Sequence, residues 1–360
     1  MIIFQKHFKN KKVLITGHTG FKGSWLTLWL NQMGAKVYGI SDNYPKKNNH
    51  FFDLKLSKNI KNYKIDICDL NKLKKIVLKT KPEYIFHLAA QSLVKKSYNF
   101  PMRTFNTNAI GTLNLLESIR YLKNKCNVVL ITSDKSYKNF EINRGYKEDD
   151  ILGGEDPYSS SKACAELIIK TYLNNFINKK NINVAIARAG NVIGGGDWSD
   201  DRIIPDSVKS WFKGKKALIR NPYSTRPWQF VLEVLRGYLL LAIKLNADTK
   251  KKLFGEAFNF GPNSKQNKSV ISLIVEIKKN WKSISWHKSK VKQTLKESKL
   301  LKLNSNKAKN MLNWYPFINF KDTIKFTILW YKNYAQKRNS TFYNSKKILL
   351  DYCSVINKEK

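Results

Sequence analysis

The sequence predicts an α/β protein built on a doubly wound parallel sheet, followed by a smaller α/β region. Apolar runs typical of buried strands recur at 13–15, 36–40, 63–70, 82–90, 127–132 and 183–187. Helix-competent segments separate these runs, and two of them begin behind Asp69 and Asp156, which can accept hydrogen bonds from a first helical turn. Strands that alternate with helices form a parallel sheet covered on both faces.

The alternation ends near Gly190, and the order of elements is irregular after it. We expect residues 1–189 to form a dinucleotide-binding domain and residues 190–336 to form a smaller α/β substrate-binding region over the carboxyl ends of the strands. Short elements of that region are expected at 204–213, 229–245, 269–281 and 322–334. Residues 337–360 form a basic, weakly patterned tail in this division.

A glycine-rich loop follows the first strand. Gly17, Gly20 and Gly23 are spaced as Gly-x-x-Gly-x-x-Gly ahead of a helix-competent segment. Such glycines allow a tight turn beside a pyrophosphate, and the helix start offers it unpaired N–H groups. The triplet alone also fits an ordinary strand-to-helix turn, but its flanking elements favour a Rossmann-type dinucleotide site. The loop residues expected to contact the cofactor are Gly17, Thr19, Gly20, Phe21, Lys22 and Gly23.

The ends of the next three strands offer further cofactor contacts. Asp42 follows the second strand, where an acidic side chain can bind the adenosine ribose and repel a 2′-phosphate; a plain loop aspartate is the alternative. Asp66 and Ile67 lie where the third strand would reach the adenine. Ala89 and Ala90 follow the fourth strand, and their small side chains let a cofactor lie against the backbone.

Composition narrows the classes of function. The chain has 360 residues, 42% of them hydrophobic, and a formal net charge of +40. Its lysines are scattered rather than gathered in a compact block with aromatic residues, so specific nucleic-acid binding is disfavoured, although the charge can attract anionic substrates. The four cysteines are far apart and show no metal-binding spacing, so we expect no metal and a reducing, cytoplasmic setting. The apolar run 237–243 is too short to span a membrane.

Tyr158 and Lys162 form a Tyr-x-x-x-Lys pair that shares one helix face. A nearby ammonium would lower the pKa of the tyrosine, and the phenolate could then remove a hydroxyl proton while hydride leaves for NAD. A solvated helix face with one aromatic residue is the alternative. The preceding glycine loop and the strand that ends at Thr132-Ser133 favour the catalytic interpretation.

Several motifs together resemble the extended short-chain dehydrogenase/reductase family, and within it the nucleotide-sugar 4,6-dehydratases. They are the glycine loop 17–26, His87-Leu88-Ala89-Ala90-Gln91, Asn108, Thr132 to Tyr137, Asp156 to Glu166, Ala187 to Trp198, Asp201 to Asp206 and Arg226 to Gln229. The resemblance covers nearly the whole chain and implies NAD as cofactor and CDP-glucose as the nucleotide-sugar substrate. It also implies contacts of Gln91, Asn108, Tyr158 and Lys162 with the cofactor.

The implied reaction oxidises sugar carbon 4, removes water across carbons 5 and 6, and returns the hydride to carbon 6. By resemblance, Tyr158 is the base for oxidation, with Lys162 beside it, and Ser133 polarises the carbon 4 oxygen. Asp134 is the acid at the carbon 6 hydroxyl and Lys135 the base at carbon 5; an Asp-Lys ion pair at a strand end is the alternative. An epimerase has no need of the Asp134-Lys135 pair, and a non-catalytic nucleotide-binding protein has no need of Tyr158 and Lys162.

Substrate contacts are expected from the second half of the chain and from Gln91 and Ser133. Arg202 and Arg226 are candidates for the diphosphate, because a guanidinium can bind two phosphate oxygens, although each also fits an ordinary surface arginine. Asn191 is a candidate contact or a turn asparagine.

The chain departs from the family at two positions. Phe230 occupies a position that is usually histidine, so we expect a change near the substrate or in the core. Ser41 stands where other members have an acidic residue, one place before Asp42. By analogy with the family we also expect a homodimer through the helices that begin near Pro101 and Pro157, and a role in deoxysugar synthesis for surface polysaccharide.

Overall fold

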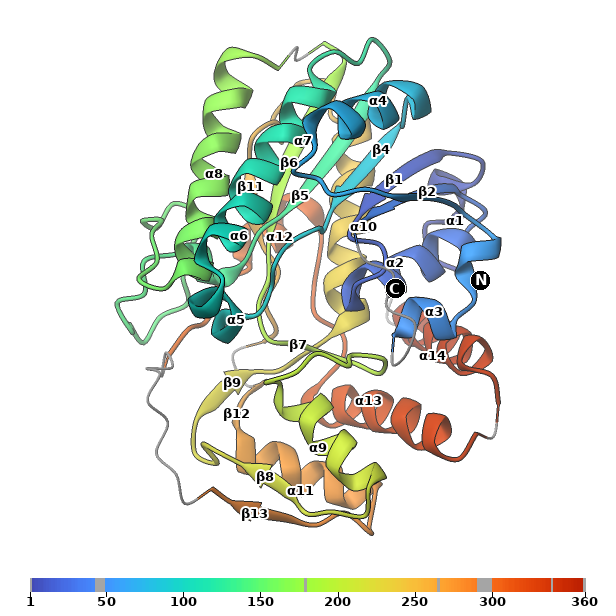
Figure 1. Cartoon of the computed structure of the whole chain (residues 1–360), viewed down its shortest axis with the longest axis vertical. Coiled ribbons are helices and arrows are strands. Elements are labelled where there is room, and N and C mark those ends of the chain that lie inside the picture. The colour runs from blue at the N-terminus through green and yellow to red at the C-terminus, as the bar shows by residue number, and fades with distance from the viewer. Residues whose placement is uncertain are drawn as a thin grey trace.

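A seven-stranded parallel sheet forms the centre of the protein (Figure 1). The computed structural model describes residues 2–42, 49–177, 180–263, 266–289, 300–337 and 339–358. The strand order is β11-β6-β5-β4-β1-β2-β3. The bounds are β1 Lys12–Thr16, β2 Lys36–Ser41, β3 Lys61–Lys64, β4 Tyr84–His87, β5 Cys126–Ile131, β6 Ile182–Arg188 and β11 Ala257–Asn259. This architecture confirms the predicted fold class.

Helices cover both faces of the sheet, as the apolar runs require. One face packs against α4 (Leu70–Thr80), α7 (Gly111–Ile119) and α8 (Pro157–Asn175), and the other packs against α2 (Phe21–Gln32) and α10 (Val231–Ala247) (Figure 1). Every residue of β4, β5 and β6 is buried, which explains why these strands are mostly apolar. Asp69 and Asp156 cap α4 and α8 through hydrogen bonds with the Lys72 and Ser159 amides, as expected.

The remaining elements lie mostly below the carboxyl ends of the strands in Figure 1. There α9 (Ile203–Phe212), α11 (Val270–Asn280) and α13 (Phe320–Ala335) accompany three two-stranded pairs. The pairs are β7 (Val192–Ile193) with β10 (Gln229–Phe230), β8 (Ala217–Ile219) with β13 (Trp286–Lys288), and β9 (Thr225–Pro227) with β12 (Asn267–Ser269). Although α10 and β11 follow residue 189 in sequence, they pack with the central sheet, and the domain division stays a prediction.

Shorter elements join these parts. They are α1 Gln5–Phe8, α3 His50–Asp53, η1 Leu56–Lys58, α5 Val94–Asn99, α6 Pro101–Phe105, η2 Asn106–Ile110, η3 Asp134–Ser136 and α12 Asn306–Leu312. The long helical stretch expected from Pro101 is divided by η2, a π-type turn between α6 and α7. The third strand is also shorter than the predicted run 63–70, since Asp66 binds the Cys68 amide in a turn at 2.9 Å.

The C-terminal segment differs from the expected weakly patterned tail. Thr341–Lys358 forms α14, which lies beside α3 and α13 (Figure 1). Its residues Ile348, Leu349, Tyr352 and Ile356 are all at most 2% exposed. These apolar residues recur at the spacing of one helix face. The sequence analysis did not identify this face because basic residues surround it.

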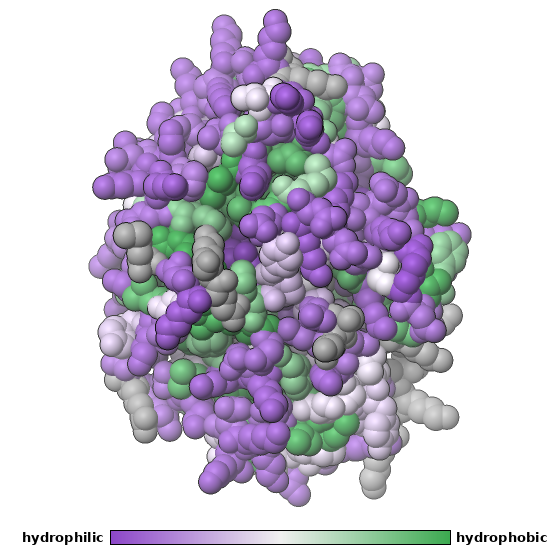
Figure 2. Space-filling view, turned by 180° about the vertical axis from the view of Figure 1, so that it is seen from behind, coloured by the Kyte–Doolittle hydropathy of each residue, from purple (hydrophilic) through white to green (hydrophobic). Residues whose placement is uncertain are grey.

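Hydrophilic residues dominate the face shown in Figure 2, with hydrophobic residues in separate patches between them. Within the described ranges, no helix has the length and apolar character to cross a membrane. The same part of the chain contains no cluster of three or more potential metal-binding His, Cys, Asp or Glu residues. Cys68, Cys126, Cys164 and Cys353 are all free thiols.

Candidate active site

A cleft of about 1430 Å³ lies beyond the carboxyl ends of the central strands. Its floor includes the loops after β1 and β4, adjacent strands whose connections run to opposite sides of the sheet. Doubly wound folds bind ligands at such a switch point. The cleft extends from the glycine loop to the β8, β9 and α9 region, so both halves of the chain line it.

The glycine loop forms the cofactor end of this cleft, and all six of its predicted contact residues line the cavity. Gly17 has φ +74°, and a Cβ there would lie 2.7 Å from the Ala89 nitrogen. A Cβ on Gly23 would lie 2.1 Å from the Gly17 oxygen. No side chain caps the start of α2 at Gly20, so its first N–H groups remain available to an anion. The loop therefore fits a dinucleotide pyrophosphate.

The predicted adenosine contacts lie beside this loop. Asp42, Asp66 and Ile67 line the cleft, and Asp42 is 3.6 Å from Arg103, measured between Oδ2 and Nη2. Ser41, at the position that is acidic in other members of the family, is buried and its hydroxyl lies 2.8 Å from that of Thr19. The exposed carboxylate of Asp42 is therefore the acidic group that the cleft presents at this point.

Ala89, Ala90 and Gln91 line the cleft after β4, whereas Asn108 does not. Asn108 instead accepts a hydrogen bond from the Gln91 amide at 2.8 Å and donates to the Gln91 carbonyl at 3.0 Å. It also donates to the Ser161 hydroxyl at 2.8 Å. The structure thus places Asn108 behind the cleft wall, where it holds Gln91 against α8.

Tyr158 and Lys162 both face the cleft from the first turns of α8. Burial raises the pKa of Tyr158 to about 12, and a hydrogen bond with Ser133 works in the opposite direction. Burial lowers the pKa of Lys162 to about 8, partly offset by the Glu166 carboxylate. The lysine alone therefore does not produce the low tyrosine pKa that the sequence suggested.

Ser133, Asp134 and Lys135 follow β5 and line the same cleft. The Ser133 hydroxyl donates to Asp134 Oδ1 at 3.0 Å and accepts from the Lys135 amide at 3.2 Å. Asp134 is buried against Gly190, where a Cβ would lie 1.8 Å from Asp134 Oδ2. This contact makes Gly190 a site residue that the sequence analysis missed, and only the absence of a side chain at that position could have indicated it.

The predicted substrate contacts lie at the other end of the cleft. Arg202 Nη1 is 3.1 Å from Asp197 Oδ2, and Arg226 Nη1 donates to the Thr225 carbonyl at 2.8 Å. Asn191 lines the cleft with φ 42°, so its backbone also explains an asparagine in a turn. Arg220, which the sequence analysis did not identify, lines the same end and lies 3.1 Å from Asp201.

Phe230 lies in the core and does not line the cleft. It stacks on Phe326 with ring centroids 5.4 Å apart and contacts Tyr352 at 5.9 Å. The departure from histidine therefore belongs to packing between β10 and the C-terminal helices.

The fold and the cleft define a class of protein, a Rossmann-type enzyme with a Tyr-Lys pair beside a dinucleotide loop. Residues 14–327 match the family model described as GDP-mannose 4,6 dehydratase, and the chain belongs to this family. The chain is 41% identical over 359 residues to the CDP-glucose 4,6-dehydratase of Salmonella typhimurium, covering 98% of this chain and 99% of the relative. It is 26% identical to the dTDP-glucose 4,6-dehydratase of Haemophilus influenzae, covering 89% and 97% of the two chains.

Solved structures of similar proteins share the fold. An epimerase from Methanothermobacter thermautotrophicus superposes with a TM-score of 0.78 at 24% identity, covering 93% of this chain and 96% of its own. The dTDP-glucose 4,6-dehydratase from Bacillus anthracis, solved in complex with NAD, gives 0.72 at 22% identity, with 91% and 98% covered.

Proposed function

We propose that this protein catalyses the 4,6-dehydration of CDP-D-glucose to CDP-4-dehydro-6-deoxy-D-glucose, with NAD as cofactor. The observation that carries the proposal is that one cleft brings together the glycine loop, the Tyr158–Lys162 pair and the Asp134-Lys135 pair. The 41% identity to the Salmonella enzyme over almost the whole chain supports CDP-glucose as the substrate.

The residues of the cofactor end fit NAD. Gly17 and Gly23 let the loop pack closely against the segment after β4 and against itself, and the uncapped start of α2 offers its N–H groups to a pyrophosphate. Asp42 suits a free adenosine ribose 2′-hydroxyl and disfavours a 2′-phosphate. The chemistry that NAD supplies when bound is acceptance of hydride from sugar carbon 4 and its later return to carbon 6.

Tyr158 and Ser133 handle the carbon 4 hydroxyl in this proposal. Tyr158 takes the hydroxyl proton during oxidation, and the Ser133 hydroxyl stabilises the oxygen as its charge develops. Lys162 lies one helical turn from Tyr158, and its protonated form favours the phenolate. Glu166, one further turn along α8, favours this protonated form of Lys162.

Asp134 and Lys135 handle the loss of water. The carbon 4 ketone acidifies the hydrogen on carbon 5, so a base there and an acid at the carbon 6 hydroxyl complete the elimination. Lys135 is assigned as the base and Asp134 as the acid. Both residues belong to the turn that follows β5.

Three arginines at the far end of the cleft suit the substrate diphosphate. Arg202, Arg220 and Arg226 line this end, and the first two are oriented by carboxylates of the loop 197–201. We assign Asn191 and Gln91 to the sugar, because both line the cleft near the catalytic turn.

We also infer a homodimer and a cytoplasmic location. Several large apolar side chains on or beside α5, α6 and α8 are exposed, among them Tyr98, Phe100, Met102 and Leu167. Exposed apolar side chains on neighbouring helices favour self-association. Free cysteines suit a reducing compartment, and the product suits synthesis of deoxysugars for surface polysaccharide.

The test is to offer CDP-, dTDP-, UDP- and GDP-glucose separately to the purified protein with NAD. We expect a 4-keto-6-deoxy product from CDP-glucose and at least about tenfold lower kcat/KM with the others. Interconversion of a sugar with its carbon 4 epimer, without water loss, would contradict the proposal.

A further inference from the structure

The turn that carries Ser133, Asp134 and Lys135 is fixed at both ends by one buried ion pair. Before the turn, the Thr132 hydroxyl donates to Glu166 Oε1 at 2.6 Å. After the turn, the Tyr137 hydroxyl accepts from Arg188 Nη1 at 2.6 Å. Arg188 and Glu166 are in turn bonded to each other, with Arg188 Nε 2.9 Å from Glu166 Oε1 and 3.0 Å from Oε2. The four residues between the two anchors, 133–136, include the proposed acid and base.

The pair itself lies behind the cleft. The Glu166 and Arg188 side chains are 2% and 4% exposed, and neither residue lines the cavity. Their charges therefore have no direct use in binding a ligand. A buried ion pair contributes little net stability over apolar packing, because both charges lose their hydration, so orientation is a better explanation of this one.

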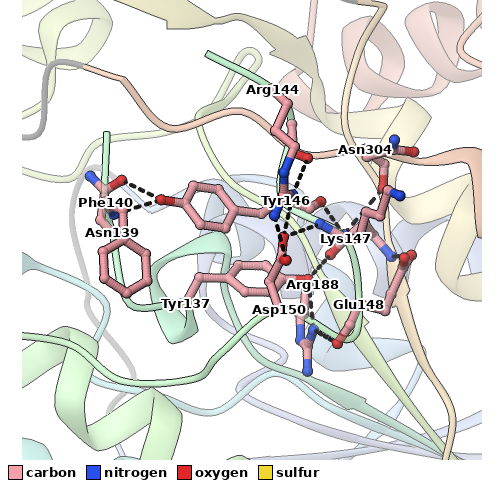
Figure 3. Close-up of polar contacts among 12 residues, drawn as sticks. Tyr137, Asn139, Phe140, Arg144, Tyr146, Lys147, Glu148, Asp150, Arg188 and Asn304 are labelled. Carbon is pink, nitrogen blue, oxygen red and sulfur yellow. Dashed lines mark hydrogen bonds and ion pairs between the residues drawn. The ribbon is translucent and has the colours of Figure 1, made fainter. Parts of the chain in front are cut away.

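Tyr137 makes several contacts in addition to its hydrogen bond with Arg188. Its hydroxyl also donates to Asn259 Oδ1 at 2.8 Å, and the guanidinium lies over its ring at 4.7 Å. The ring stacks on Tyr146, with centroids 5.2 Å apart, and Arg188 donates to the Glu148 carbonyl at 2.9 Å (Figure 3). These contacts join the turn to strands β6 and β11 and to the segment 146–148.

We propose that Glu166 and Arg188 are positioning residues, which act through Thr132 and Tyr137 to hold Asp134 and Lys135 in place for the elimination step. The inference rests on the proposed function and adds residues to it. Neither residue touches the substrate; each acts through a neighbour that frames the turn.

The placement predicts which chemical step is sensitive. Tyr158 and Lys162 belong to a regular helix whose start is fixed by Asp156, and they do not depend on the turn for their position. Asp134 and Lys135 belong instead to a short 3₁₀ segment, which lacks the hydrogen-bonded turns of a long helix on either side. Loosening the anchors should slow deprotonation at carbon 5 and loss of the carbon 6 hydroxyl more than oxidation at carbon 4.

Two variants remove one oxygen each without emptying the core. Thr132→Val deletes the hydroxyl that binds Glu166, and Tyr137→Phe deletes the one between Arg188 and Asn259. We expect kcat to fall about 10- to 100-fold in each, since a displacement near 1 Å costs about that factor. We expect KM for CDP-glucose and the dissociation constant of NAD to stay within about twofold.

Isotope effects separate positioning from general damage. With substrate deuterated at carbon 5, the kinetic isotope effect should rise in both variants, because proton removal there becomes more rate-limiting. With substrate deuterated at carbon 4, the effect should fall towards unity. Unchanged kcat, or a lower kcat with both isotope effects unchanged, would overturn the inference.

The chain offers matched controls. Tyr352 bonds a second buried pair far from the cleft, accepting from Arg236 Nε at 3.2 Å and donating to Glu233 Oε1 at 2.6 Å. Thr80 is a buried threonine that donates to the Ile76 carbonyl at 2.8 Å. Tyr352→Phe and Thr80→Val should lower thermal stability to a similar degree but leave kcat and both isotope effects unchanged.

A readout without turnover keeps this inference separate from the proposed function. Amide hydrogen exchange at residues 133–137 should become at least about tenfold faster in Tyr137→Phe than in the parent or in Tyr352→Phe. Unchanged exchange there would refute the anchoring even if the parent dehydrates CDP-glucose. A parent protein that dehydrates no nucleotide sugar, with faster exchange in Tyr137→Phe, would refute the function and leave the anchoring intact.

Discussion

Substitution of Gly190 by alanine should displace Asp134, the proposed acid of the elimination step, while leaving the Asp134 residue itself unchanged. An added Cβ would lie 1.8 Å from Asp134 Oδ2 and 2.2 Å from its Cγ. An ordinary contact needs 3.4 Å or more, so the carboxylate must move by at least 3.4 − 1.8 = 1.6 Å. The open cleft beside Asp134 gives it room to move, so the protein should still fold at a cost of about 1–3 kcal/mol.

A displacement of this size is large for catalysis. Misplacing a reacting group by about 1 Å costs roughly 100-fold in rate, so kcat should fall at least about 100-fold. Steady-state assays with CDP-glucose and NAD measure this, and thermal unfolding measures the cost to the fold. NAD affinity should change little, because Gly190 is not among the predicted cofactor contacts.

A double-mutant cycle with Asp134→Asn identifies the route of the effect. If Gly190→Ala acts through Asp134, its effect on kcat should nearly vanish once the carboxylate has been replaced. Additive losses in the double variant would show that Gly190 acts elsewhere. A kcat for Gly190→Ala within about threefold of the parent would refute the reasoning outright.

Three further predictions concern the rest of the cleft. Tyr158→Phe should lower kcat at least about 1000-fold with little change in NAD affinity, as measured by steady-state assay and titration; a smaller loss would argue against Tyr158 as the base. Because burial lowers the pKa of Lys162 to about 8, its ammonium is present below that pH and lost above it. NAD affinity measured by titration should therefore weaken as pH rises through about 8, and Lys162→Met should flatten that dependence; an unchanged profile would contradict the assignment. Gly17→Ala should abolish NAD binding in the same titration, because φ +74° and the 2.7 Å approach to Ala89 leave no room for a Cβ; retained binding would exclude the loop as the pyrophosphate site.

Local sequence patterns were sufficient to predict the main elements of the central sheet. Strands 36–40, 127–132 and 183–187 and the caps at Asp69 and Asp156 are all present, because buried parallel strands and aspartate caps have strong local signals. The π-type turn at 106–110 has no such signal, since its hydrogen bonds depend on how α6 and α8 pack. The sequence analysis missed helix α14 because its lysines make the segment polar on average. Its apolar face is recognisable only when the helix is seen packed against α3 and α13.

The same distinction applies to the site. Glycine spacing and the Tyr158–Lys162 pair are one-dimensional patterns, and the structure brings them into one cleft. The roles of Gly190, Thr132 and Glu166 arise from contacts between segments more than 30 residues apart or from the absence of a side chain, so no spacing could indicate them. Asn108 was identified from the family motif, but only the structure shows that it supports Gln91 and lies outside the cleft lining.

The most direct test of the proposed reaction follows one hydrogen atom. CDP-glucose that carries deuterium on carbon 4 is incubated with the protein and NAD, and the product is examined by NMR spectroscopy and mass spectrometry. The mechanism predicts that the deuterium appears in the methyl group at carbon 6 of the same sugar. Deuterium that is lost to solvent, or that remains on carbon 4 of a product that has lost no water, would contradict it.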